Sequence, residues 1–156
     1  MDTRDRPAVM ASVKGIEALE AIEAIRQLKA RYCLCVDGQR WDELRELFTP
    51  EAATDTGGQG RSRGRDSFVD KVSTLLTGAV TLHVAGMPFI TLQSSTAAHG
   101  IWTMEDRLWF PDAAAPDGWR HWQGSGRYHE DYVRVQGRWL IRTMRLERVE
   151  PGPRHG

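Results

Sequence analysis

Residues 22–48 read IEAIRQLKARYCLCVDGQRWDELRELF, and this stretch decides how the chain begins to fold. In it and just before it, apolar residues recur at intervals of three and four, which is typical of an amphipathic helix with one apolar stripe. The stripe consists of Ile16, Leu19, Ile22, Ile25, Leu28 and Tyr32. We expect Gly38 to end this helix as a C-terminal cap. A second, short helix is expected at residues 41–48, closed by the following TPEA.

The rest of the chain predicts one more helix and then a sheet. TGGQGRSRG at residues 56–64 has the composition of a loop, and residues 65–76 place four apolar side chains on one helical face, with Asp66 as the expected N-cap. From residue 79 the apolar period changes to two, which predicts strands at 80–93, 97–110, 119–135 and 138–150. Helices followed by adjacent long strands indicate an α+β fold, a cone-shaped curved antiparallel sheet wrapped around the long N-terminal helix. We expect a flexible arm at 1–12, a single domain at 13–150 and a flexible tail at 151–156.

Composition excludes several classes of function. The 156 residues carry 21 basic and 21 acidic side chains, so no net field favours nucleic acid or an anionic membrane. We see no apolar run of bilayer length and no signal peptide, which favours a cytoplasmic protein. Cys33 and Cys35 are two apart on one helix, so their side chains diverge, and neither a disulfide nor a zinc site is expected. The sequence predicts no metal and no cofactor.

Two charged residues interrupt apolar strand faces. Asp106 shares a face with Trp102, Met104, Leu108 and Phe110. It therefore faces solvent, has a hydrogen-bonding or cationic partner, or keeps its proton. Arg148 ends an apolar row on the last strand, on a face that we also expect to carry Arg142. It could pair with Asp106 through two hydrogen bonds or extend its guanidinium into water.

Asp37 poses the same question at the end of the first helix. A carboxylate at a helix C-terminus is unfavourable without a positive partner, so Asp37 either lies in a solvated turn or pairs with a residue elsewhere. His83, in the apolar strand TLHVAGMPF, could be an ordinary core histidine or that partner. A His–Asp pair is a general base with an oriented ring. Tyr32 precedes Asp37 on the core-facing stripe and would bring a phenol into the same interior.

The chain resembles the SnoaL-like branch of the nuclear transport factor 2-like superfamily, the fold of scytalone dehydratase and ketosteroid isomerase. The resemblance is carried by IEAIRQLKARYCLCVDGQRWDELRELFTPEA, LHVAGMPFITL, GIWTMEDRLWF and GRWLIRTMRLERV. Bile acid 7α-dehydratases look similar in their LDG…WDEL and W…EDRL patterns, although Ala85, Gly86 and Met87 replace a more polar stretch. The resemblance implies an active site at Tyr32, Asp37, His83, Asp106 and Arg148, with Arg145 and Arg142 as alternative arginines.

These residues predict a cofactor-independent dehydratase that uses His83 and Asp37 as its general base. Phe89, Trp102 and Met104 are expected to form apolar walls around a polycyclic, polyketide-, terpenoid- or steroid-like substrate with a carbonyl and a hydroxyl. A double-bond isomerase or a polyketide or terpenoid cyclase could use the same groups, and a non-catalytic binding or assembly domain could use the same fold. Relatives associate through the outer sheet face, so a homodimer or homotrimer is expected, and Trp109, Trp119 and Trp122 are candidate interface residues.

Overall fold

The computed structural model describes residues 15–57 and 60–149, which form three helices and six strands. The helices are α1 (Gly15–Asp37), α2 (Trp41–Arg45) and α3 (Arg65–Leu75). The strands are β1 (Phe48–Asp55), β2 (Arg61–Arg63), β3 (Val80–Leu92), β4 (Ala97–Pro111), β5 (Trp119–Val135) and β6 (Arg138–Arg148). The predicted arm at 1–12 and tail at 151–156 lie outside the described residues.

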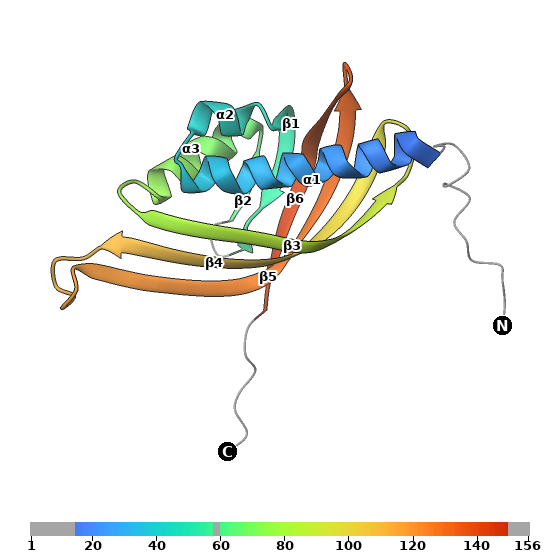
Figure 1. Ribbon diagram of the computed structural model, residues 1–156. Helices are drawn as coiled ribbons and strands as arrows, with labels where there is room; N and C mark the ends of the chain where they lie inside the picture. The colour runs from blue at the N-terminus through green and yellow to red at the C-terminus, as the bar shows by residue number, and fades with distance from the viewer. Residues whose placement is uncertain (1–14, 58–59, 150–156) are drawn as a thin grey trace.

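The six strands form one curved sheet in the order β2-β1-β6-β5-β4-β3. All neighbours are antiparallel except β1 and β6, which run parallel. Helix α1 crosses one face of the sheet, and α2 and α3 lie on the same side, near β1 (Figure 1). The predicted α+β class and the long helix laid on a curved sheet are confirmed.

The core lies between α1 and the sheet. Ile25, Leu28 and Val36 of α1 are buried against apolar side chains of the inner sheet face. The first turns of the predicted stripe do not take part, because Ile16 and Leu19 are 75% and 68% exposed. The apolar period of the sequence therefore marks the correct helix face but overestimates how far the core extends along it.

The N-terminal part of the sheet differs from the sequence-based expectation. The residues TPEA do not simply close α2, because they belong to β1, and part of the expected loop at 56–64 forms β2. Residues 48–55 contain a proline and two alanines, so their intrinsic preference for a strand is weak. Hydrogen bonds to the neighbouring strands β6 and β2 stabilise this segment as a strand despite its weak intrinsic preference.

Helix α1 ends where expected, but Gly38 is not its left-handed residue. Gln39 adopts a φ of 51°, its N–H donates to the carbonyl of Val36, and the N–H of Arg40 donates to the carbonyl of Cys35. These two hydrogen bonds form a Schellman motif in which Gln39, one position beyond the glycine, is the left-handed residue. The Gln39 side chain also donates to the carbonyls of Leu76 and Ala79. The helix end and its terminal Asp37 are thereby tied to the segment that leads into β3.

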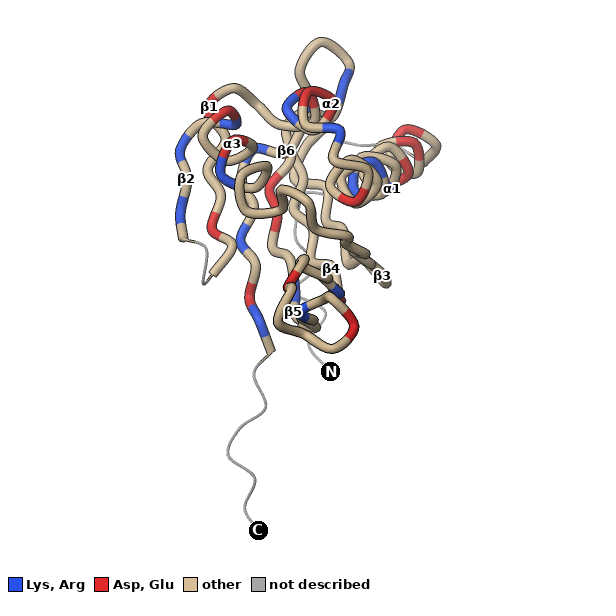
Figure 2. The backbone as a smooth tube through the Cα atoms, turned by 90° about the vertical axis from the view of Figure 1, so that its left-hand side faces the viewer, with Lys and Arg blue, Asp and Glu red and all other residues tan. Residues whose placement is uncertain are grey.

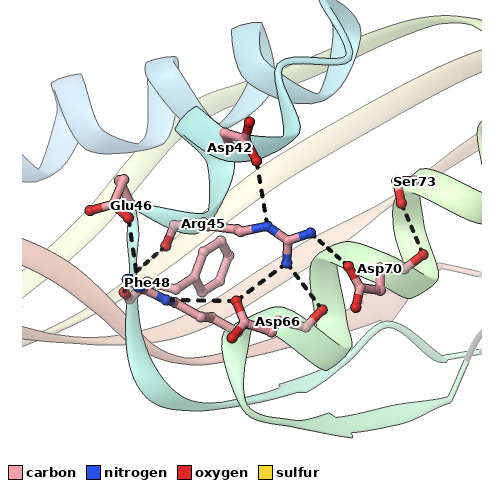
Figure 3. Close-up of polar contacts among 8 residues, drawn as sticks. Asp42, Arg45, Glu46, Phe48, Asp66, Asp70 and Ser73 are labelled. Carbon is pink, nitrogen blue, oxygen red and sulfur yellow. Dashed lines mark hydrogen bonds and ion pairs between the residues drawn. The ribbon is translucent and has the colours of Figure 1, made fainter.

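A surface ion-pair network joins α2 to α3 (Figure 3). Arg45 Nη2 donates to Asp70 Oδ1 at 2.6 Å, and Arg45 Nη1 donates to Asp66 Oδ1 at 3.3 Å. Asp66 therefore pairs with Arg45, whereas Gly64 occupies the N-cap position of α3 without a side-chain cap, so the predicted N-cap is wrong.

Other acidic residues gather at the start of α1 and basic ones on β2 (Figure 2). None of the described helices is long and apolar enough to cross a membrane.

Candidate active site

A cavity of about 580 Å³ opens between the C-terminal half of α1, helix α3 and the inner face of the sheet. Its volume lies in the range of pockets that enclose small organic ligands. The apolar lining residues are Val36, Phe68, Val72, Leu75, Leu76, Leu108, Phe110 and Leu146. All five residues predicted as catalytic, Tyr32, Asp37, His83, Asp106 and Arg148, lie at this cavity: four line it, and Asp37 contacts His83.

Asp37 has the partner that its place at the helix end requires. His83 Nδ1 lies 2.7 Å from Asp37 Oδ1, and the hydroxyl of Thr81 donates to the same oxygen at 2.8 Å. The backbone N–H of His83 donates to Asp37 Oδ2 at 2.9 Å. Three groups of β3 thus hold one carboxylate at the end of α1.

These contacts orient the imidazole of His83. An ionised Asp37 can only accept hydrogen bonds, so Nδ1 carries the proton in the neutral ring and Nε2 has a free lone pair. His83 lines the cavity, and its side chain is 10% exposed. A neutral imidazole held in this way is arranged as a general base.

Asp106 is held on the same sheet face by Arg148. His83 and Asp106 are direct cross-strand partners on β3 and β4. Arg148 donates to both carboxylate oxygens of Asp106, from Nη1 at 2.9 Å and from Nη2 at 2.6 Å. This bidentate pair compensates an acid whose side chain is 3% exposed, and the bond to Asp106 raises the pKa of the guanidinium.

Gly124 of β5 leaves room for the Arg148–Asp106 pair, and Gly126 of the same strand allows a close approach of the β6 backbone. Asp106 lies opposite Gly124, and Gly126 lies opposite Arg148, so the arginine must pass over β5 to reach β4. A Cβ on Gly124 would come within 2.3 Å of Arg148 Nη1 and 2.7 Å of Asp106 Oδ1. A Cβ on Gly126 would come within 2.3 Å of the carbonyl oxygen of Glu147. The two closely spaced glycines of QGSG at 123–126 are the signal in the sequence for this crossing.

The three candidate arginines are now distinguished. Only Arg148 lines the cavity, whereas Arg142 and Arg145 are exposed. The expectation that Arg142 shares the face of Arg148 is wrong because the pairing of β5 and β6 shifts between Asp131 and Tyr132. An irregularity of this kind moves the side chains beyond it to the other face.

Tyr32 lies on the wall of the cavity beside a second tyrosine, Tyr128. Their ring centroids are 5.9 Å apart and the rings meet edge to face. Burial, together with the nearby Cys33 and Glu130, raises the pKa of the Tyr32 phenol well above its ordinary value. Tyr32 therefore stays protonated at neutral pH and is a hydrogen-bond donor. Tyr128, whose pKa is raised by the same burial, is a second phenol that the sequence analysis did not select.

The three predicted apolar walls lie elsewhere. Phe89 is 71% exposed, beyond an irregularity of β3 where Met87 adopts a φ of 44°. Trp102 is buried in the core and donates from Nε1 to the hydroxyl of Tyr132 at 2.8 Å. Met104 is also buried in the core. Strand alternation identifies the face on which Trp102 and Met104 lie, but it does not tell which part of that face is covered by a helix and which is open.

The walls are supplied instead by α3 and by the β4–β5 hairpin. Phe68 and Val72 of α3 close one side together with Leu76 at the C-cap of this helix, and their helical spacing predicted the face but not what it covers. Arg120, His121 and Trp122 of β5 line the other side, so Trp122 is a cavity residue as well as 53% exposed. Among residues 15–57 and 60–149, no three His, Cys, Asp or Glu side chains are grouped as metal ligands.

Comparison with known proteins agrees with this architecture. A family model described as a SnoaL-like domain matches residues 17–145. The chain belongs to the SnoaL-like family. The matched residues begin at the third residue of α1 and end within β6, three residues before its last residue, Arg148. The fold is that of the nuclear transport factor 2-like superfamily.

Solved structures share the fold at low sequence identity. A candidate scytalone dehydratase from Novosphingobium aromaticivorans is 19% identical, with a TM-score of 0.77 over 86% of this chain and 87% of that one. The hexachlorocyclohexane dehydrochlorinase LinA-type3 from Novosphingobium barchaimii is 18% identical, with a TM-score of 0.73 over 90% of this chain and 94% of that one. Rv3472 of Mycobacterium tuberculosis, described as of unknown function, is 23% identical, with a TM-score of 0.71 over 86% of this chain and 75% of that one. At these identities the likeness shows the fold alone.

Proposed function

We propose that this SnoaL-like protein is a lyase of the dehydratase type, which needs only its own side chains for the reaction. The observation that carries the proposal is the contact of 2.7 Å between His83 Nδ1 and Asp37 Oδ1 at the wall of the cavity. Oriented acid–base groups beside a bound substrate are sufficient to remove a proton next to a carbonyl. Two of the fold neighbours are described as a dehydratase and a dehydrochlorinase, both of which eliminate a small molecule.

The proposed reaction begins when Nε2 of His83 takes a proton from the carbon next to a substrate carbonyl. The electron pair moves toward the carbonyl oxygen, where the hydroxyl of Tyr32 donates a hydrogen bond to the developing enolate. The enolate then expels the β-hydroxyl, the carbon–oxygen bond breaks, and the proton on His83 leaves with that hydroxyl as water. The products are an α,β-unsaturated carbonyl compound and water, and the imidazole is again neutral.

Asp106 and Arg148 are assigned a supporting role in this reaction. The two side chains form an ion pair on the same sheet face as His83, where Asp106 is its partner on the neighbouring strand. The pair can therefore hold the polar end of a substrate. The remaining walls are apolar and suit a polycyclic, polyketide-, terpenoid- or steroid-like hydroxy-carbonyl compound. Phe68, Leu108 and Leu146 replace the walls that the sequence analysis had assigned to other residues.

A double-bond isomerase or a cyclase remains the alternative within the enzymes, because the same base and donor serve both reactions. The mass of the product distinguishes them: dehydration removes one water, whereas isomerisation leaves the mass unchanged. Arg120 and His121 at the wall of the cavity could serve a larger substrate that needs additional polar contacts. A binding domain without catalysis would convert none of the compounds.

The test is an incubation with a panel of β-hydroxy ketones on fused-ring, terpenoid and polyketide scaffolds, followed by mass spectrometry of the products. We expect loss of one water from at least one scaffold, and its disappearance in His83→Ala. The chain offers a matched control, because His99 Nδ1 lies 2.8 Å from Asp131 Oδ1 on the opposite face of the sheet, outside the cavity. His99→Ala should keep full activity. Equal losses in the two variants would contradict the proposed base.

A further inference from the structure

A charged pair is buried directly behind the tyrosines of the cavity. Lys29 and Glu130 are 1% and 0% exposed, and Lys29 Nζ lies 2.5 Å from Glu130 Oε1. Neither residue lines the cavity. Neither is among the site residues expected from the sequence, and the proposed reaction uses neither.

The cation of this pair lies against both phenol rings. Lys29 Nζ is 3.4 Å from the centroid of the Tyr128 ring and 4.1 Å from that of Tyr32. These distances are well within the reach of a cation–π interaction, which is strongest where water is absent. The ammonium group therefore contacts the rings of two tyrosines that themselves line the cavity.

The anion of the pair points away from the cavity. Glu130 Oε2 accepts a hydrogen bond from the hydroxyl of Tyr132, which in turn accepts one from Trp102 Nε1 at 2.8 Å. Tyr132 and Trp102 are buried and do not line the cavity. The pair is thus an oriented dipole whose positive end contacts the two cavity phenols and whose negative end is fixed in the core.

Stability alone gives little reason to keep such a pair. Replacing a buried ion pair with apolar side chains of similar volume is often neutral or stabilising, because the loss of hydration offsets the attraction between the charges. A cation in contact with a phenol ring, by contrast, draws electron density from the hydroxyl oxygen and strengthens it as a hydrogen-bond donor. The placement of the pair therefore suits the electrostatics of the cavity.

We propose that Lys29, anchored by Glu130, is a positioning residue that holds the rings of Tyr32 and Tyr128 and strengthens their hydrogen bonds to a negatively charged oxygen of the ligand. This inference rests on the proposed function, in which Tyr32 donates to a developing enolate. The ligand class that the device favours is a planar apolar molecule with an acidic oxygen, such as an enol or a phenol.

The test uses 2-naphthols of graded acidity as probes, which mimic an enolate and need no known substrate. Dissociation constants measured by fluorescence for the wild type should fall as the acidity of the naphthol rises, and Tyr32→Phe should flatten this dependence. In K29M/E130L we expect about tenfold weaker binding of the most acidic naphthol and less than about threefold weaker binding of the least acidic one. A K29Q/E130Q variant, which keeps a neutral hydrogen-bonded pair, should give the same flattening if the apolar variant does not fold.

The control is Tyr132→Phe, which removes the hydrogen bond to Glu130 but leaves Lys29 over the rings. It should lower the melting temperature without changing the dependence on naphthol acidity. A folded K29M/E130L or K29Q/E130Q variant with the wild-type dependence would overturn the inference while the proposed function stands. Failure of every naphthol to bind the wild type would instead count against the cavity as an enolate site, and both proposals would fall together.

Discussion

Gly124→Ala should disrupt the Arg148–Asp106 pair although it changes neither partner. The added Cβ would lie 2.3 Å from Arg148 Nη1, whereas ordinary contacts begin at 3.4 Å, so the two atoms must separate by about 1 Å. Asp106 cannot yield easily because its own Oδ1 would lie 2.7 Å from the same Cβ and its side chain is buried. The Nη1–Oδ1 hydrogen bond, now 2.9 Å, is therefore the one expected to break.

The loss can be estimated from this bond. A hydrogen bond between charged groups contributes about 1.5–3 kcal/mol, so we expect about 2 kcal/mol less stability. For a domain of this size that corresponds to a melting temperature lower by about 4–8 °C. Differential scanning calorimetry of the purified variant measures both quantities.

Gly86→Ala is the matched control for this experiment. Gly86 also lies within a strand, and a Cβ there would meet only Thr103 Oγ1, at an ordinary contact distance of 3.7 Å. Its melting temperature should stay within about 2 °C of the wild type, since an alanine that fits reduces the entropy of the unfolded chain. If Gly124→Ala melts together with Gly86→Ala, Arg148 does not depend on the missing Cβ and the reasoning is refuted.

Three further predictions address other parts of the molecule. Asp37→Asn should lower the rate of the water-loss reaction by about 10²- to 10⁴-fold, because the amide no longer fixes the tautomer of His83; a rate within threefold of wild type would contradict this. Phe48→Ala should cost about 3–5 kcal/mol in chemical denaturation, since Phe48 is fully buried against Tyr32 and Phe68, whereas the exposed Phe89→Ala should cost less than about 0.5 kcal/mol. Asp131→Asn should lower the melting temperature relative to the wild type above about pH 4, and this difference should shrink as the pH falls toward 2. A difference that stays constant down to pH 2 would refute this.

The sign of the Asp131 effect follows from its surroundings. Burial alone would raise the pKa of this carboxyl, but hydrogen bonds from His99 and Thr143 lower it below the ordinary value. A carboxyl with a lowered pKa in the folded state binds its proton more weakly there than in the unfolded chain. Its contribution is therefore complete above the unfolded pKa, near 3.9, and disappears as the pH falls through the folded one.

The C-terminal sheet could be predicted from the sequence because local pattern and tertiary environment agree there. The strands β3 to β6 begin at the expected residues and end within two of them, since one face of each is more buried than the other and the turns between them contain serine, proline or glycine. β1 could not be predicted, because its pairing with β6 joins residues about 90 positions apart, and no local signal reports such a contact.

The site was predictable to the extent that a buried charge requires a partner. Asp37 and Asp106 each stand where an unpaired carboxylate would be costly, and this requirement led to His83 and Arg148. The apolar cavity walls could not be predicted in this way, because an apolar residue such as Trp102 fits the strand pattern both in a filled core and beside a cavity. The Lys29–Glu130 pair was missed for a related reason: on an amphipathic helix, a lysine next to the apolar stripe is normally assumed to reach solvent.

The two carboxylates of the site are compensated in different ways, and the difference suits the proposed chemistry. Asp106 is neutralised by a permanent cation, so that pair keeps zero net charge throughout the reaction. Asp37 accepts hydrogen bonds from a hydroxyl and a backbone N–H and contacts the imidazole of His83. In the proposed reaction the imidazole starts as the neutral base, so the His83–Asp37 pair then carries one negative charge. When His83 takes a proton, that pair becomes neutral while one negative charge develops on the substrate oxygen. The total charge of the cavity stays constant, and the negative charge moves from Asp37 and His83 toward Tyr32, where the phenol and the Lys29 cation behind it can stabilise it.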